Sequence, residues 1–282
     1  MGATNITLTA GMRKNLFSLQ QTQSLLERTQ KRLATGQRVN SAVDDPVNYF
    51  TALGHRQRSE DLSSRKDEMS ESVQLVAAAN EGVESITALI ASAKSLAQSA
   101  LSGATTSEIS TLYSQYEEVL SQIDFLAADS GYKGVNLLDG TAVTHTVKFD
   151  EQGDSSLTMT GFDASSLGAT LSLSTHATNA WVSAGGSADK AEINSAIARL
   201  DSARSALRTE AQKLSTNLST INIRQDFTKG MINTLEDGAA ELTNADMNEE
   251  GANMLMLQTR QSLGTTSLSL ASQAAQSVLR LF

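Results

Sequence analysis

Cysteine is absent from this 282-residue sequence, and proline occurs only once, at Pro46. The lack of thiols excludes disulfides and thiolate metal sites. Because proline interrupts helices and sheet ladders, its near-absence permits very long uninterrupted helices. Aromatic residues are scarce at 4%, although hydrophobic residues make up 40% of the chain. We therefore expect a core of aliphatic side chains and Ala, which suits helix-on-helix packing.

Basic residues are fewer than acidic ones, which gives a formal net charge of -9. An acidic protein repels phosphate backbones, so we expect no nucleic-acid partner. No apolar run approaches the ~20 residues that a membrane span needs, so no membrane partner is expected. The first residues lack the basic and apolar regions of a cleavable secretory signal, so export would need another route.

Four segments carry apolar residues at spacings of three and four, which predicts helices that each bury one seam. These segments cover 12–33, 69–101, 193–235 and 254–282, and a further helix is expected near 106–128. The segment over 193–235 keeps its phase throughout, so it needs a long partner. The segment over 69–101 is the candidate of similar length.

The region 131–185 differs from the rest because Gly, Ser and Thr become frequent. Apolar residues alternate over 143–149 and again over 157–159, on either side of a turn-like 150–154, which predicts a β-hairpin. Leu171 and Leu173 are candidates for a further short strand. Ser187 and Asp189 are candidates for the N-cap of the helix that follows.

The order of these elements is nearly palindromic: helix, long helix, small β insert, long helix, helix. The simplest fold is a chain that goes out and comes back. We predict a mainly α fold, with a long antiparallel helical coiled-coil rod, paired terminal helices and a small β-hairpin insert. The first segment would pair with the fourth and the second with the third.

The terminal segments carry apolar residues beside their seams. Met256, Leu263 and Leu270 recur every seven residues, two positions after seam residues, and Phe17 and Leu25 lie off the first seam. A two-helix coiled coil would leave these side chains in water, at ~25 cal/mol per Å² of apolar surface. They could pack on the same chain or on neighbouring copies in a polymer, and we favour the polymer. The predicted assembly interface is Leu16, Phe17, Leu19, Leu25, Leu26, Leu33, Met254, Met256, Leu257, Leu263, Leu268, Leu270, Val278 and Phe282.

No residue pattern predicts a catalytic, metal or cofactor site. The three histidines, His55, His145 and His176, are far apart in sequence and lie in no zinc-binding motif. The sequence also contains no phosphate-binding glycine loop and no Gly-x-Ser-x-Gly elbow. We therefore expect a structural protein rather than an enzyme.

Three pairs of adjacent acidic residues have simpler explanations than catalysis. Asp44 and Asp45 precede Pro46 and are expected to form a turn and a helix cap. The pairs 117–118 and 249–250, all Glu, are expected to lie on solvated helix faces or to form ion pairs between subunits.

Three stretches of the sequence resemble bacterial flagellins. Residues 32–46 read Arg-Leu-Ala-Thr-Gly-Gln-Arg-Val-Asn-Ser-Ala-Val-Asp-Asp-Pro, which resembles the N-terminal signature of that family. Residues 122–138 resemble the segment just before the flagellin β region. Residues 245–282 resemble the flagellin C-terminus, in the form found in alphaproteobacterial members.

The resemblance implies an extracellular homopolymer of many copies, the flagellar filament used for swimming. In that family the terminal helices form an inner tube around a central channel, and the longer helices form an outer tube. The short insert implies that large outer surface domains are missing. The implied division is 1–40 as the N-terminal inner-tube helix, 41–185 as the long helix, second helix and β-hairpin of the outer tube, 186–240 as its returning long helix, and 241–282 as the C-terminal inner-tube helix.

The resemblance also implies partners. Flagellins leave the cell through a type III export apparatus, and the implied partners are an export chaperone, the flagellar cap and the hook–filament junction proteins. Flagellins recognised by the Toll-like receptor carry Arg-x-x-Glu-Leu-Ala, whereas residues 92–97 read Ser-Ala-Lys-Ser-Leu-Ala. Because Ser92 and Ser95 replace the Arg and Glu, weak or no recognition is predicted. Ser and Thr within 141–187 could accept sugars.

Two alternatives to a flagellin stay open. A hook–filament junction protein has similar termini, but residues 246–282 favour flagellin. A secreted coiled-coil adhesin or effector would leave the matched terminal motifs unexplained.

Overall fold

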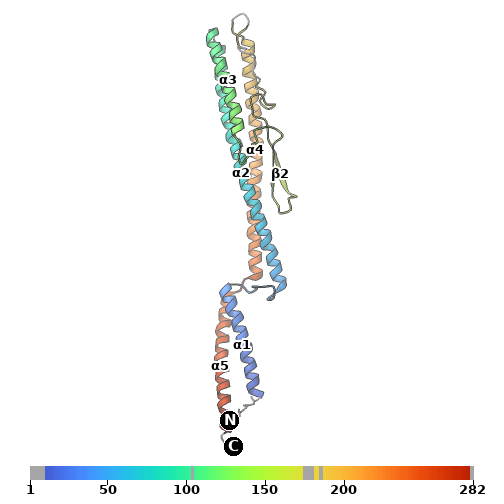
Figure 1. Cartoon of the computed structure of the whole chain (residues 1–282), viewed down its shortest axis with the longest axis vertical. Helices are drawn as coiled ribbons and strands as arrows, with labels where there is room; N and C mark the ends of the chain where they lie inside the picture. Colours follow the sequence, from blue (N-terminus) through green and yellow to red (C-terminus); the bar gives the residue numbers. More distant parts are fainter. Residues whose placement is uncertain (1–9, 103–104, 174–180, 184–186, 280–282) are drawn as a thin grey trace, which may run out of the picture. The chain divides into compact units, whose positions relative to one another are not determined.

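A computed structural model of the chain describes residues 10–102, 105–173, 181–183 and 187–279. Two compact units are formed: a terminal unit of Met1–Arg58 with Asn233–Phe282, and a central unit of Ser59–Ile232. In the described residues, no helix is apolar enough over a sufficient length to cross a membrane. The elements are α1 (Ala10–Thr35), α2 (Pro46–Leu101), α3 (Thr106–Asp129), β1 (Thr144–Lys148), β2 (Ser156–Thr160), α4 (Lys190–Thr243) and α5 (Met247–Leu279), as Figure 1 shows.

The predicted element order and the mainly α class are confirmed. The two long helices, α2 and α4, have 56 and 54 residues, as the near-absence of proline allows. The expected shorter helix near 106–128 is α3. In the terminal unit α1 and α5 lie side by side, so the predicted pairing of the first and fourth segments is also confirmed (Figure 1).

Helices α2 and α4 are antiparallel in the central unit. Lys94 Nζ lies 2.6 Å from Asp201 Oδ1, and Gln225 Nε2 donates to Ser70 Oγ over 2.8 Å. The same number of residues separates the two contacts on each helix. Residue numbers rise along α2 as they fall along α4, so the two helices are antiparallel. The Lys94 ammonium also lowers the pKa of Asp201. Aliphatic residues of α2, α4 and α3 are buried together in one core, including Ile86, Ile90, Leu120, Ile123, Leu200 and Leu207.

The β-hairpin covers this core with one face. Strands β1 and β2 pair with Val147 opposite Leu157 and His145 opposite Met159. Val147 and Met159 are buried, whereas the hydroxyls of Thr146 and Thr158 meet on the outer face. The alternation of apolar and polar residues therefore predicted both the strands and their buried face correctly.

The predicted short strand at Leu171 and Leu173 is wrong. Ser172, between them, has φ +48, a left-handed conformation that a strand cannot contain. Its N–H donates to the Gly168 carbonyl over 2.8 Å, which closes a turn. Leu171 and Leu173 are nonetheless buried and anchor this turn to the core.

Asp189, rather than Ser187, caps α4. Its Oδ1 accepts the N–H groups of Ala191 and Glu192, both over 3.1 Å. This contact satisfies two backbone donors that the first helical turn leaves without partners.

Candidate assembly surface on the terminal helices

Two contacts between α1 and α5 fix how these helices pair. Gln261 Nε2 donates to Gln23 Oε1 over 2.9 Å. One turn along, Leu19 packs so closely on Gly264 that a Cβ there would come within 2.7 Å of Leu19 Cδ2. Residue numbers rise along α1 as they fall along α5, so the pair is antiparallel. The glycine allows the two helices to approach closely at this point.

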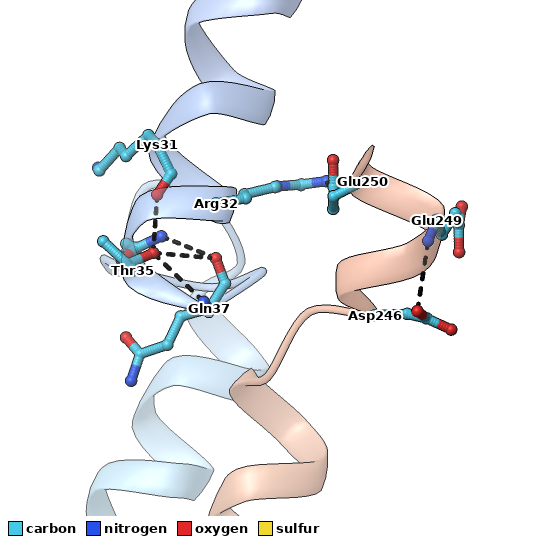
Figure 2. Close-up of polar contacts among 8 residues, drawn as sticks. Lys31, Arg32, Thr35, Gln37, Asp246, Glu249 and Glu250 are labelled. Carbon is cyan, nitrogen blue, oxygen red and sulfur yellow. Dashed lines mark hydrogen bonds and ion pairs between the residues drawn. The ribbon is translucent and has the colours of Figure 1, made fainter. Parts of the chain in front are cut away.

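An ion pair continues the same register near the other end of α1. Arg32 Nη1 lies 2.7 Å from Glu250 Oε1, and Figure 2 shows the two side chains reaching across from α1 and α5. The Glu250 side chain keeps only 9% of its surface exposed, against 27% for Arg32. A nearly buried carboxylate with one guanidinium partner makes this pair sensitive to substitution.

The structure corrects the expectation for two of the glutamates. Glu250 is neither solvated nor free for another subunit, because it faces α1 and pairs within the chain. Glu117 is only partly exposed, and its Oε1 is buried without a hydrogen-bond partner. Glu118 and Glu249 are exposed, as expected.

Backbone hydrogen bonds join the chain just after α1 to the chain just before α5. Gly36, with φ +70, ends α1, and its carbonyl accepts the N–H of Ala245 over 2.9 Å. The N–H of Arg38 donates to the Thr243 carbonyl over 2.7 Å. Asp246 caps α5 through the N–H groups of residues 248 and 249 (Figure 2 shows the latter contact). The Gly36–Ala245 and Arg38–Thr243 bonds hold the chain just after α1 against the end of α4 and the chain between α4 and α5, beside the ion pair.

Asp44 and Asp45 form the predicted turn and helix cap. Asp44 Oδ2 accepts the N–H and the hydroxyl of Ser41, both over 3.0 Å. The Ser41 hydroxyl is the main reason why the pKa of Asp44 lies below its usual value. Asp45 Oδ1 accepts the N–H of Asn48 over 3.1 Å and caps α2, which begins at Pro46.

The buried face of α1 is rotated relative to the predicted seam. The three- and four-residue spacing places Leu16 on the predicted seam, but Leu16 is exposed, whereas Thr22 and Thr29 are buried. Thr22 donates its hydroxyl to the Ser18 carbonyl over 2.8 Å, so its polar group is satisfied within the helix. A pattern that counts only apolar residues misses such threonines.

The fourteen predicted interface residues differ widely in exposure. Leu26 and Leu257 are buried in the terminal unit. Five are partly buried, namely Leu19, Leu25, Leu33, Met254 and Leu268. The side chain of Val278 and the whole of Phe282 lie outside the described residues. Five are exposed, namely Leu16, Phe17, Met256, Leu263 and Leu270.

Met256, Leu263 and Leu270 form a stripe on α5, here called the outer stripe. Met256, Leu263 and Leu270 are 57%, 64% and 62% exposed. Seven residues make nearly two helical turns, so side chains at this spacing line up along one face. The outer stripe thus lies away from the face that packs on α1.

Sequence reasoning missed other exposed apolar side chains. In the terminal unit, Val43, Val47 and Phe50 are exposed around the start of α2. Val47 and Phe50 are three residues apart on α2, a helical spacing that could have identified them, whereas Val43 lies in the turn before the helix. In the central unit, Ile223 and Phe227 are exposed on α4, four residues apart.

The described residues contain no group of three or more His, Asp or Glu side chains that could hold a metal ion. His145 Nε2 lies 2.9 Å from Ser72 Oγ, and burial lowers the pKa of this histidine. His176 lies outside the described residues. The apolar surfaces of the terminal helices are therefore the strongest candidate site.

Known proteins resemble this chain over nearly all of its length. The N-terminal helical region of bacterial flagellin matches residues 7–143, and the C-terminal helical region of bacterial flagellin matches residues 191–282. The chain belongs to the bacterial flagellin family. Flagellin FljK of Caulobacter vibrioides is 27% identical over 283 residues, and the matched region covers 100% of both chains. A flagellin of Brucella melitensis is 27% identical over 272 residues, 95% of each chain. The crystal structure of Bacillus cereus flagellin has 18% identity and a TM-score of 0.46, over 57% of this chain and 88% of that one.

Membership of the flagellin family determines the general function. Flagellins are structural proteins that assemble into the helical filament of the bacterial flagellum, an extracellular appendage used for motility. This chain is therefore a filament subunit, and neither a junction protein nor an adhesin is favoured. Its length fits a flagellin without large surface domains, as the short insert predicted.

Proposed function

We propose that the exposed apolar side chains of α1 and α5 are the surface through which copies of this flagellin pack against one another. The observation that carries this proposal is the outer stripe of Met256, Leu263 and Leu270. The α1–α5 pair already has a buried face, and the outer stripe takes no part in it. Exposed large apolar side chains in a regular row are typical of a protein–protein interface.

The spacing of the outer stripe indicates the kind of contact. Apolar residues every seven positions present one straight edge to a neighbouring helix, as in a coiled coil. On α1, Phe17 and Leu16 are exposed as well and supply a second apolar patch in the same unit. When one apolar surface packs on a different surface of the next copy, the contact repeats without closing and builds an open helical polymer.

The remaining roles follow the family. The segments 1–40 and 241–282 would line the inner tube, and the long helices over 41–185 and 186–240 the outer tube. The chain would carry no catalytic activity. An export chaperone, the flagellar cap and the junction proteins would be its partners before and during assembly.

Replacing both Leu263 and Leu270 by Ser is expected to prevent polymerisation without unfolding the subunit. Each Leu loses about 1.5–3 kcal/mol of apolar burial between copies, so the critical concentration should rise by about 100-fold or more. Sedimentation of polymer across a concentration series measures this change. The matched control replaces Gln258 and Ser262, exposed polar residues of the same helix, by Ala. If the serine variant assembled like this control, the outer stripe would not be an assembly surface.

We also propose that the Toll-like receptor recognises this flagellin weakly or not at all. Ser92 and Ser95 are exposed on α2 where recognised flagellins carry Arg and Glu, and Lys94 between them is held by Asp201. Two side chains capable of charged hydrogen bonds are thus replaced by short hydroxyls. Reporter cells should respond weakly to the unchanged protein and more strongly to the Ser92→Arg, Ser95→Glu variant. Activation by the unchanged protein at nanomolar concentration would contradict the proposal.

A further inference from the structure

The structure describes seven of the eight methionines of this chain, all but Met1, and sorts these seven by their access to solvent. Met69 and Met159 are fully buried in the central unit, and Met12 is buried in the terminal unit. Met247 and Met256, both on α5, are 48% and 57% exposed. Because the chain has no cysteine, methionine thioethers are its most readily oxidised side chains. Exposure therefore makes Met247 and Met256 the first two described positions that a dissolved oxidant reaches.

We propose that Met256 is a modification site at which peroxide oxidises the unassembled subunit and stops its assembly. The inference rests on the proposed function, because its effect depends on the outer stripe being an interface between copies. The Met256 sulfur attacks one oxygen of hydrogen peroxide, the O–O bond breaks, and a sulfur–oxygen bond forms. The other oxygen leaves as hydroxide and takes the proton of the transferred oxygen to become water, so the thioether loses two electrons to give the sulfoxide and the peroxide gains them.

The position of Met256 gives this oxidation its consequence. A sulfoxide is polar and accepts hydrogen bonds, whereas Leu263 and Leu270 beside it offer an apolar contact. Packing the sulfoxide against a neighbouring copy would bury a polar group without a partner, which opposes association. In a finished filament the same contact would exclude the oxidant. Met256 should therefore be open to oxidation before assembly and protected afterwards.

Met247 supplies a matched comparison in the same helix. It has the same side chain and a similar exposure, but it lies nine residues before Met256. Nine residues make two and a half turns, which puts Met247 on the opposite side of α5 from the outer stripe. Oxidation of Met247 should leave assembly unchanged.

The test treats monomer with limiting hydrogen peroxide, maps the sulfoxides by peptide mass spectrometry, and then measures assembly by sedimentation. The full-length protein and the Met247→Leu variant should both lose assembly as sulfoxide accumulates at Met256. The critical concentration should rise by about tenfold or more for a sulfoxide in an apolar contact. The Met256→Leu variant should assemble to the same extent with and without the peroxide treatment, whatever its own critical concentration. Methionine sulfoxide reductase should restore the oxidised full-length protein.

Three outcomes would overturn the inference. In the first, Met256 resists peroxide that oxidises the buried Met69. In the second, peroxide reduces assembly of the Met256→Leu variant as much as that of the unchanged protein. In the third, Met256 is oxidised without any change in assembly. The last outcome is read together with the Leu263→Ser, Leu270→Ser variant. If that variant fails to assemble, only the oxidation inference is wrong. If it assembles normally, the proposed interface is wrong as well.

Discussion

Removal of residues 254–282 is expected to abolish filament growth while the central unit stays folded. The deletion removes the outer stripe together with Leu257, Gln261 and Gly264, which α1 packs against. The central unit keeps its own core of buried residues from α2, α3, α4 and the hairpin. Its stability should therefore depend little on α5.

Two measurements on the truncated chain test both parts of this expectation. Circular dichroism should show the helix content falling only by the share that α1 and α5 contribute, with the main thermal transition within a few degrees of that of the full chain. Electron microscopy and sedimentation should detect no polymer at concentrations where the full chain assembles. Filaments grown by the truncated chain would refute the assembly role of α5. Loss of the main transition would show instead that the central unit needs the terminal one.

Replacement of Arg32 by Ala is expected to separate α1 from α5. The substitution leaves the Glu250 carboxylate nearly buried and without its guanidinium partner. This should destabilise the pairing of α1 with α5 by about 2–3 kcal/mol. A pair of single helices has little stability to lose, because isolated helices are marginal in water. Amide hydrogen exchange should therefore accelerate by about 30-fold or more along both helices. Assembly should weaken with it, since the outer stripe would no longer be held on an ordered unit.

The charge-swapped variant, Arg32→Glu with Glu250→Arg, separates an effect of pairing from an effect of either residue alone. It should recover a large part of the lost protection, because the two charges again face each other across the helices. The matched control is Arg65→Ala, which breaks an ion pair whose acid, Glu68, is exposed. This substitution should lower the free energy of unfolding by less than about 1 kcal/mol. If the swapped variant were no more protected than Arg32→Ala, the ion pair would not hold the two helices together.

Most of the fold could be predicted from sequence because repeated spacing reports a repeated environment. The three- and four-residue spacing over 193–235 required a long partner, and α2 supplies it. Alternation over 143–149 identified a strand with one buried face. Each of these spacings repeats over many residues, so a single polar residue at an apolar position does not hide the pattern.

The errors arose where burial depends on tertiary contacts of polar groups. Glu250 lies in phase with the apolar seam of α5, but its charge suggested solvent, and only the position of Arg32 reveals the pair. Thr22 and Thr29 are buried on α1 where an apolar pattern would not place them. The strand expected at Leu171 and Leu173 failed because the left-handed Ser172 is set by the turn in which it lies.

The candidate surface was only partly predictable for a related reason. The seven-residue repeat of Met256, Leu263 and Leu270 is visible in the sequence and identifies a second apolar face of the last helix. The same repeat could not say which apolar residues the chain would cover itself, as it does for Leu26 and Leu257.

The most direct test of the assembly surface is a reconstruction by electron cryo-microscopy of filaments grown from the purified protein, at a resolution that shows side chains. We predict a helical tube around a central channel in which Met256, Leu263 and Leu270 of each copy pack against a neighbouring copy. A filament in which these three side chains face water would contradict the proposal.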